Sequence, residues 1–111
     1  MRRVHTFSTR TVDAVAVLGL AIARARRVSR WSQAELAERA GVSPDTLGSV
    51  ERGAPTVAIG IVFEVAALVG LDLFGADADQ LPSLVNRGRD QLSLLPSRVR
   101  TRGSDVFEDD F

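Results

Sequence analysis

The chain has 111 residues, of which 45% are hydrophobic and 25% are charged, so we expect a single globular domain. It has no cysteine, which excludes a disulfide framework and a thiolate metal site, and its one histidine is His5. The formal net charge is zero, but residues 1–53 and 81–103 are basic, residues 54–80 and 104–111 are acidic, and every positive side chain is an arginine. These blocks predict a basic face and an acidic tail.

No segment predicts a membrane span or a cleaved leader. Glycines and acids interrupt the most apolar run, residues 57–73, which is also too short to cross a bilayer. The apolar stretch 14–23 runs into arginines and has no small-residue cleavage site after it. We therefore expect a cytoplasmic protein with no membrane partner.

The first half of the chain predicts two helices. Residues 1–10 are polar and lack periodicity, which predicts a flexible N-terminal arm. Apolar residues then recur at helical spacing over about 12–28, with Thr11 as the candidate N-cap. A second helix begins at Ser32, the first residue of a capping box. It ends at Gly41, because glycine adopts the positive φ of a helix C-terminus with little steric strain.

Three further helices complete an all-α pattern. Ser43 caps a short helix with Pro44 in its first position, where the missing N–H costs nothing. A strongly apolar helix follows at about 58–69, and a fifth lies near 82–93. We expect three parts: the flexible arm 1–10, a compact five-helix domain over 11–95, and an extended, acidic-ended tail over 96–111.

The corner between the second and third helices has the pattern of a helix-turn-helix. A capped helix of about eight residues, a turn containing glycine and a short capped helix follow one another. Such a unit holds its second helix away from the body, where it can enter a major groove of DNA. The alternative is two packed helices of an ordinary small bundle.

Several short motifs resemble the helix-turn-helix of the lambda-repressor/Cro (Xre) family over about residues 14–74. They are SQAELA at 32–37, AGVS at 40–43, TL at 46–47 and VERG at 50–53. Softer similarity to antitoxins of the HipB type lies in PTVAIG at 55–60, LVGL at 68–71, LLPSRVR at 94–100 and the terminal DDF. The resemblance implies a lambda-repressor-like domain, a homodimeric repressor of a double-stranded DNA operator, and a HipA-like serine/threonine kinase toxin as partner.

The positions that match the family pattern imply a set of DNA contacts. These residues are Gln33, Ser43, Asp45, Thr46, Ser49 and Arg52, with Arg27 and Arg30 from the preceding corner. Gln33 would lie beside a phosphate, and its amide could bond the DNA backbone or a base edge. The hydroxyl groups of Ser and Thr specify bases only weakly. For Arg27 and Arg30 two interpretations stay equally open: the side chains contact phosphates, or they lie on a solvated face. Pro44, Asp45 and Ser49 depart from the basic residues often found at these positions, so we expect modest affinity per subunit and binding to two half-sites.

Two residues near the corner have alternative readings. Asp45 is expected to stabilise the helix N-terminus, and the alternative is a hydrogen bond from a cytosine amino group. Trp31 is expected to pack onto Leu36 as a hydrophobic staple, and the alternative is stacking on bases. A homodimer is expected because the apolar residues at 58–74 exceed what one small body can bury.

No arrangement of residues predicts an enzyme, a metal site or a cofactor, since nucleophile–base pairs, ligand clusters and phosphate loops are missing from the sequence. The rival function is a protein-interaction module acting through the C-terminal tail, whose candidate partner-binding residues are Val106, Phe107, Asp109, Asp110 and Phe111. This tail could bind a partner, cover the protein's own basic face, or only solvate the chain. A stand-alone Xre regulator without a toxin is a further alternative.

Overall fold

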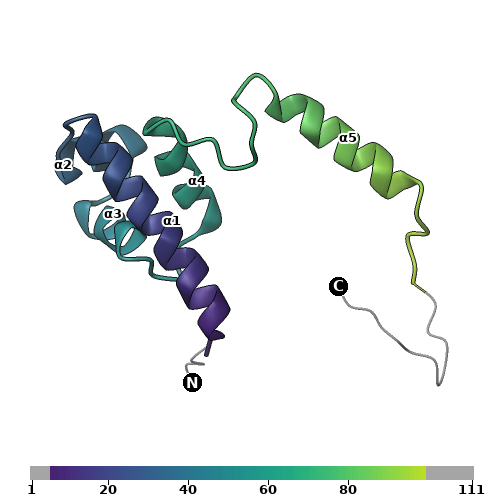
Figure 1. Cartoon of the computed structure of the whole chain (residues 1–111), viewed down its shortest axis with the longest axis horizontal. Coiled ribbons are helices and arrows are strands. Elements are labelled where there is room, and N and C mark those ends of the chain that lie inside the picture. Colours follow the sequence, from purple (N-terminus) through teal and green to yellow (C-terminus); the bar gives the residue numbers. More distant parts are fainter. Residues whose placement is uncertain (1–5, 100–111) are drawn as a thin grey trace. The chain divides into compact units, whose positions relative to one another are not determined.

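The computed structural model describes residues 6–99, and within this range the only regular elements are five helices. They are α1 (Thr9–Val28), α2 (Gln33–Ala40), α3 (Pro44–Glu51), α4 (Ile59–Leu68) and α5 (Leu81–Ser93), labelled in Figure 1. This confirms the predicted all-α, five-helix class. The chain divides into two compact units after Leu73, so α1 to α4 form the first unit and α5 lies in the second. The range 11–95 predicted as one domain spans both units.

Helix α1 begins earlier than the sequence suggested. Ser8 is its N-cap and accepts a hydrogen bond from the Thr11 amide at 3.2 Å, so the expectation that Thr11 is the cap was wrong. Thr9 and Arg10, which were expected in a flexible arm, are helical. The apolar periodicity begins only at Val12, and it therefore could not mark the polar first turn.

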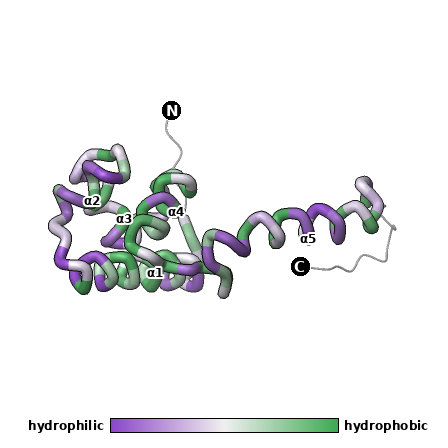
Figure 2. Tube along the Cα trace, turned by 90° about the horizontal axis from the view of Figure 1, so that it is seen from above, coloured by the Kyte–Doolittle hydropathy of each residue, from purple (hydrophilic) through white to green (hydrophobic). Residues whose placement is uncertain are grey.

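The core of the first unit combines all four of its helices. α2 packs on α3 and α4, and α1 packs on α3, crossing it in Figure 1. Hydrophobic and hydrophilic residues alternate along α1 in Figure 2, as expected for a helix with one buried face. The buried apolar side chains are Ile22 from α1, Leu36 and Ala37 from α2, Leu47 and Val50 from α3, and Val65 and Ala66 from α4.

Two glycines allow α1 to approach the end of α3 closely. A Cβ added to Gly19 would lie 2.6 Å from the Val50 carbonyl oxygen and 2.7 Å from that of Glu51. Gly53 has a φ of +76°, and a Cβ there would lie 2.8 Å from the Ala16 Cα. This contact fixes α3 against α1 through backbone atoms, and α3 can therefore present its other face outward.

The caps of the helix-turn-helix corner agree with the sequence. Ser32 and Glu35 form both hydrogen bonds of the capping box, and Gly41 ends α2 with a φ of 71°. Ser43 caps α3 by accepting a hydrogen bond from the Thr46 amide at 3.1 Å. These local bonds define the lengths of α2 and α3 and the turn between them. None of the helices within residues 6–99 is long and apolar enough to cross a membrane.

The second unit contains α5 and no residue of that helix is buried. Its apolar side chains are exposed or half-buried: Leu81, Leu84, Val85 and Leu92. The spacing of these residues places them along one side of the helix. α5 therefore presents an amphipathic face that its own unit leaves uncovered.

Candidate nucleic-acid interface

The outer surface of α3 is polar and its inner surface is buried. Leu47, Gly48 and Val50 are buried against the rest of the first unit. Asp45 and Arg52 are exposed. Thr46 and Ser49 are partly buried. Asp45, Ser49 and Arg52 follow one another at spacings of four and three residues and therefore lie on one face.

The two hydroxyl groups at the start of α3 bind each other. Ser43 donates to the Thr46 Oγ1 at 3.0 Å while its own oxygen accepts from the Thr46 amide. The Ser43 hydroxyl is therefore already used in capping. The Thr46 hydroxyl accepts from Ser43 and keeps its own proton to donate to an external acceptor.

The other end of α3 carries a second polar pair. Arg52 donates from Nη2 to the Ser49 Oγ at 3.3 Å, and its guanidinium is exposed. Asp45, in the first turn of α3, makes no hydrogen bond or ion pair with any residue from 6 to 99. Its position in that turn is favourable for a negative charge, so helix stabilisation and a base contact both remain predictions.

The N-terminus of α2 meets the C-terminal end of α3 at a buried carboxylate. Gln33, the first residue of α2, donates from Nε2 to Oε1 of Glu51 at 2.8 Å. Arg26 of α1 donates to the same carboxylate, from Nε to Oε2 at 2.6 Å and from Nη2 to Oε1 at 3.0 Å. The side chains of Arg26 and Glu51 are only 8% and 7% exposed.

Both members of this ion pair are held in their charged forms. Burial alone would raise the pKa of Glu51, but hydrogen bonds from Arg26 and Gln33, together with the charges of Arg26 and Arg27, outweigh it and lower that pKa. The hydrogen bond to Glu51 raises the pKa of Arg26 against the opposing effect of burial. The pair is therefore ionised at neutral pH.

Arg27 and Arg30 lie at the corner between α1 and α2. Both are exposed, and neither forms an ion pair with the part of the chain that the structure describes. The positive charge of Arg27 contributes to the lowered pKa of Glu51. Arg30 adopts a positive φ of 63° in the turn. Both arginines are available for an anionic ligand, and their role as phosphate contacts stays a prediction.

Trp31 packs against the core cluster that contains Leu36, as expected for a staple. Its carbonyl oxygen accepts from Arg26 Nη1 at 2.8 Å, and the Arg39 guanidinium lies 4.5 Å from the centre of its ring. The half-buried indole therefore contacts both the core cluster and the Arg39 guanidinium. These contacts favour the staple over base stacking.

Arg26 and Glu51 are the site residues that the sequence analysis missed. In the sequence, Arg26 is one of the arginines that follow the apolar stretch 14–23, and no separate role was predicted for it. It follows Ile22 by four residues, however, and therefore lies on the same buried face of α1. A charged residue on an apolar face requires a partner, so this spacing could have shown that Arg26 is buried and paired, but not that its partner is Glu51.

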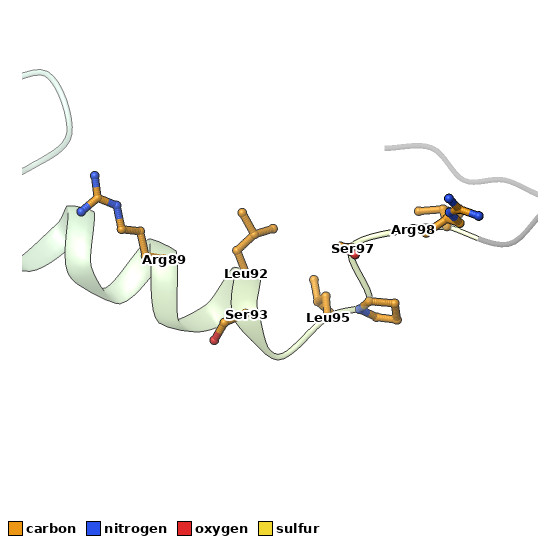
Figure 3. Close-up of a pocket in the computed structure, with 8 residues that line it drawn as sticks. Arg89, Leu92, Ser93, Leu95, Ser97 and Arg98 are labelled. Atoms are coloured by element: carbon orange, nitrogen blue, oxygen red, sulfur yellow. The ribbon is translucent and has the colours of Figure 1, made fainter.

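The predicted partner-binding residues Val106, Phe107, Asp109, Asp110 and Phe111 lie outside the described residues. Among the described residues, the end of α5 carries a hollow, which Arg89, Leu92, Leu95 and Arg98 help to line. Figure 3 shows Leu92 and Leu95 pointing to the same side of this segment, with Ser93 pointing away. Within residues 6–99, no group of three or more acidic or histidine side chains could hold a metal ion.

Comparisons with known proteins agree with this geometry. A family model described as a helix-turn-helix domain matches residues 17–84. The solved HipB–O2 20mer complex matches with a TM-score of 0.51 and 20% sequence identity, covering 70% of this chain and 97% of that one. No curated protein gives a significant match.

The structural likeness to HipB confirms the expected lambda-repressor-like fold. The family model covers more than half of the chain and includes α2, α3 and the turn between them. The chain therefore belongs to the helix-turn-helix domain family and is a DNA-binding regulator of the Xre-like type.

Proposed function

We propose that this protein is a sequence-specific transcriptional repressor that inserts α3 into the major groove of an operator. The observation that carries this proposal is the α2–turn–α3 unit, whose inner face is buried while its outer face is polar and open. A short helix held in this way fits the groove of B-form DNA. The proposed contacts are Gln33, Ser43, Asp45, Thr46, Ser49, Arg52, Arg27 and Arg30.

The charges around this face limit the affinity of one subunit. Asp45 places a negative charge on α3, and the arginines that counter it, Arg27, Arg30 and Arg52, lie at the edges of the unit rather than on the centre of α3. Phosphate contacts supply most of the affinity of a DNA-binding protein, whereas hydroxyls discriminate bases weakly. We therefore propose that two subunits bind two half-sites together.

A homodimer fits the exposed apolar surface of the chain. Ile59 on α4 is 72% exposed, and Leu92 on α5 is 69% exposed. The unburied face of α5 is the surface that pairing would cover. Neither helix is part of the α2–turn–α3 unit.

The finer proposal is an antitoxin that represses its own operon and neutralises a HipA-like kinase toxin. Its support is the fold shared with HipB and the HipB-like motifs at residues 55–60, 68–71 and 94–100. In this proposal the acidic, phenylalanine-containing segment 104–111 binds the toxin through Val106, Phe107, Asp109, Asp110 and Phe111. Cytoplasmic location and a non-enzymatic role belong to the same proposal.

Two variants separate DNA binding from partner binding. Changing Thr46 and Ser49 together to glutamate adds two negative charges to the outer face of α3. Operator affinity should fall at least about tenfold, while toxin binding stays unchanged. Ala67→Glu on the exposed side of α4 adds charge away from α3 and is the control.

Deleting residues 104–111 should have the opposite effect, with toxin binding lost and operator binding retained. Tighter DNA binding after the deletion would instead indicate that the tail covers the protein's own basic face. If the Thr46/Ser49 variant binds the operator as well as the wild-type protein does, α3 is not the reading helix. The protein-interaction module would then be the better function.

A further inference from the structure

The carboxamide of Gln33 is hydrogen-bonded to Glu51. Its Nε2 lies 2.8 Å from Oε1 of Glu51, and a carboxylate can only accept hydrogen bonds. The amide nitrogen must therefore face Glu51. The second N–H and the carbonyl oxygen of this exposed side chain stay available to an external partner.

Glu51 is itself held by a bidentate contact. Arg26 binds both carboxylate oxygens, at 2.6 and 3.0 Å, and binds the Trp31 carbonyl oxygen at 2.8 Å with its remaining nitrogen. Both charged side chains are more than nine-tenths buried. Arg26 thus joins α1, the turn before α2, and the carboxylate at the end of α3 in one rigid arrangement.

We propose that Glu51, backed by Arg26, is a positioning residue that fixes the Gln33 carboxamide for contact with the DNA backbone. This inference rests on the proposed DNA-binding function. A free glutamine has three rotatable side-chain bonds, and ordering them on binding reduces affinity. The Glu51 contact orders the side chain before DNA arrives.

The ion pair with Arg26 also explains how the Glu51 carboxylate can lie near the proposed phosphate contacts. An unpaired Glu51 would repel the phosphates, but the guanidinium of Arg26 balances its charge at contact distance. Gln33 is therefore held by an acid without a net negative charge at that edge of the site.

Nuclear magnetic resonance of the full-length chain without DNA tests the fixed orientation directly. In the wild-type protein, we expect the two Gln33 side-chain amide protons to differ clearly in shift and to exchange slowly with water. In the double variant Arg26→Met/Glu51→Met, both signals should move to ordinary glutamine values. Gln91, an exposed glutamine of α5 whose side chain has no hydrogen bond to the described residues, is the internal control. Gln33 signals that match those of Gln91 in the wild-type protein would overturn the proposal.

Operator affinity tests the consequence for binding. Gln33→Ala should weaken binding about fivefold in the wild-type background and less than about twofold in the Arg26→Met/Glu51→Met background. A purely structural role for the ion pair predicts equal losses in both backgrounds and would overturn the positioning role. The paired replacement removes both charges at once, which is far less damaging than stranding one of them.

Arg26→Gln/Glu51→Gln is the second variant, in case the double replacement by methionine does not fold by circular dichroism. It removes both charges together but keeps an amide that can accept a hydrogen bond from Gln33, and it should give an intermediate loss of affinity for Gln33→Ala. A loss as large as in the wild-type background would contradict the proposal. If the wild-type protein binds no duplex at all, the proposed function fails, and the amide signals still decide whether Glu51 fixes Gln33.

Discussion

Arg26 shows how one buried charge organises the first unit. Its guanidinium satisfies both oxygens of Glu51 and the Trp31 carbonyl, so that neither charge is stranded in the core. Removing one member of such a pair costs several kcal/mol, about 3–5, because the other charge stays buried. The pair fixes geometry at the corner where DNA contacts are proposed.

The ionisation of Glu51 predicts loss of stability in acid. Burial opposes its charge, but bonds from Arg26 and Gln33 lower its pKa below the ordinary value of about 4.3. A lowered folded-state pKa contributes stability that is complete above the unfolded pKa and is lost as the pH falls through the folded one. The free energy of unfolding in urea should therefore decrease below about pH 4.5.

Glu51→Gln should reduce this decrease, because the variant has no carboxyl group to protonate at that position. Glu64→Gln, which alters an exposed acid of α4 with no resolved pKa shift, is the matched control and should follow the wild-type curve. Identical acid profiles for wild-type protein and Glu51→Gln would contradict the role assigned to the pair.

Gly19 is predicted to be intolerant of any side chain. A Cβ there would lie 2.6 and 2.7 Å from two carbonyl oxygens and 3.0 Å from the Gly53 nitrogen, all of them backbone atoms. Gly19→Ala should lower the free energy of unfolding by about 1–3 kcal/mol. Gly60→Ala, where a Cβ meets nothing within 4 Å, should be neutral or stabilising. If both variants change the melting temperature equally in thermal denaturation, the close approach of α1 to the end of α3 would be contradicted.

At the scale of elements, local capping decides which helices could be predicted accurately. The bounds of α2 and α3 were predictable because Ser32, Gly41 and Ser43 carry chemistry specific to helix ends. The start of α1 was placed too late, because a serine in a polar segment looks like any loop residue. The Arg26–Glu51 contact spans 25 positions, and no local pattern predicts a pair at that separation.

Helix α4 begins without a side-chain cap, and this offers a stabilising change. Ala58 occupies the N-cap position with extended backbone angles, φ −57° and ψ 135°, and no side chain accepts a bond there. Ala58→Asp should add such a bond and a favourable charge at the helix N-terminus, raising the free energy of unfolding by about 0.5–2 kcal/mol. Ala67→Asp, an exposed position near the other end of α4, should not stabilise. Urea denaturation of both variants measures the difference.

At the scale of the whole molecule, the fold divides where the sequence did not indicate a boundary. The apolar spacing at 82–93 predicted a fifth helix and was included in one domain, because periodicity reports that a face is apolar but not what covers it. In the structure that face has no buried residue, and the core is complete within α1 to α4. Likewise, the sequence predicted that the hydroxyl groups of α3 lie on its outer surface. It could not predict the hydrogen bond from Gln33 to Glu51, because these residues are 18 positions apart.

This division predicts that residues 1–73 fold without the rest of the chain. Their melting temperature should stay within about 5 °C of the full-length value at low protein concentration, since no buried core residue is removed. If α5 pairs two chains, the full-length protein should also melt at a higher temperature as its concentration rises, and the shortened chain should not. Failure of residues 1–73 to fold would contradict the two-unit description.

The most direct test of the account is binding of the purified full-length protein to a labelled duplex from its own upstream region, compared with a scrambled duplex and titrated with salt. The account predicts selective binding to the upstream duplex, with log affinity falling linearly against log salt concentration. The slope should be about 0.9 for each phosphate contacted. Equal and weak binding to both duplexes would contradict an operator-reading repressor.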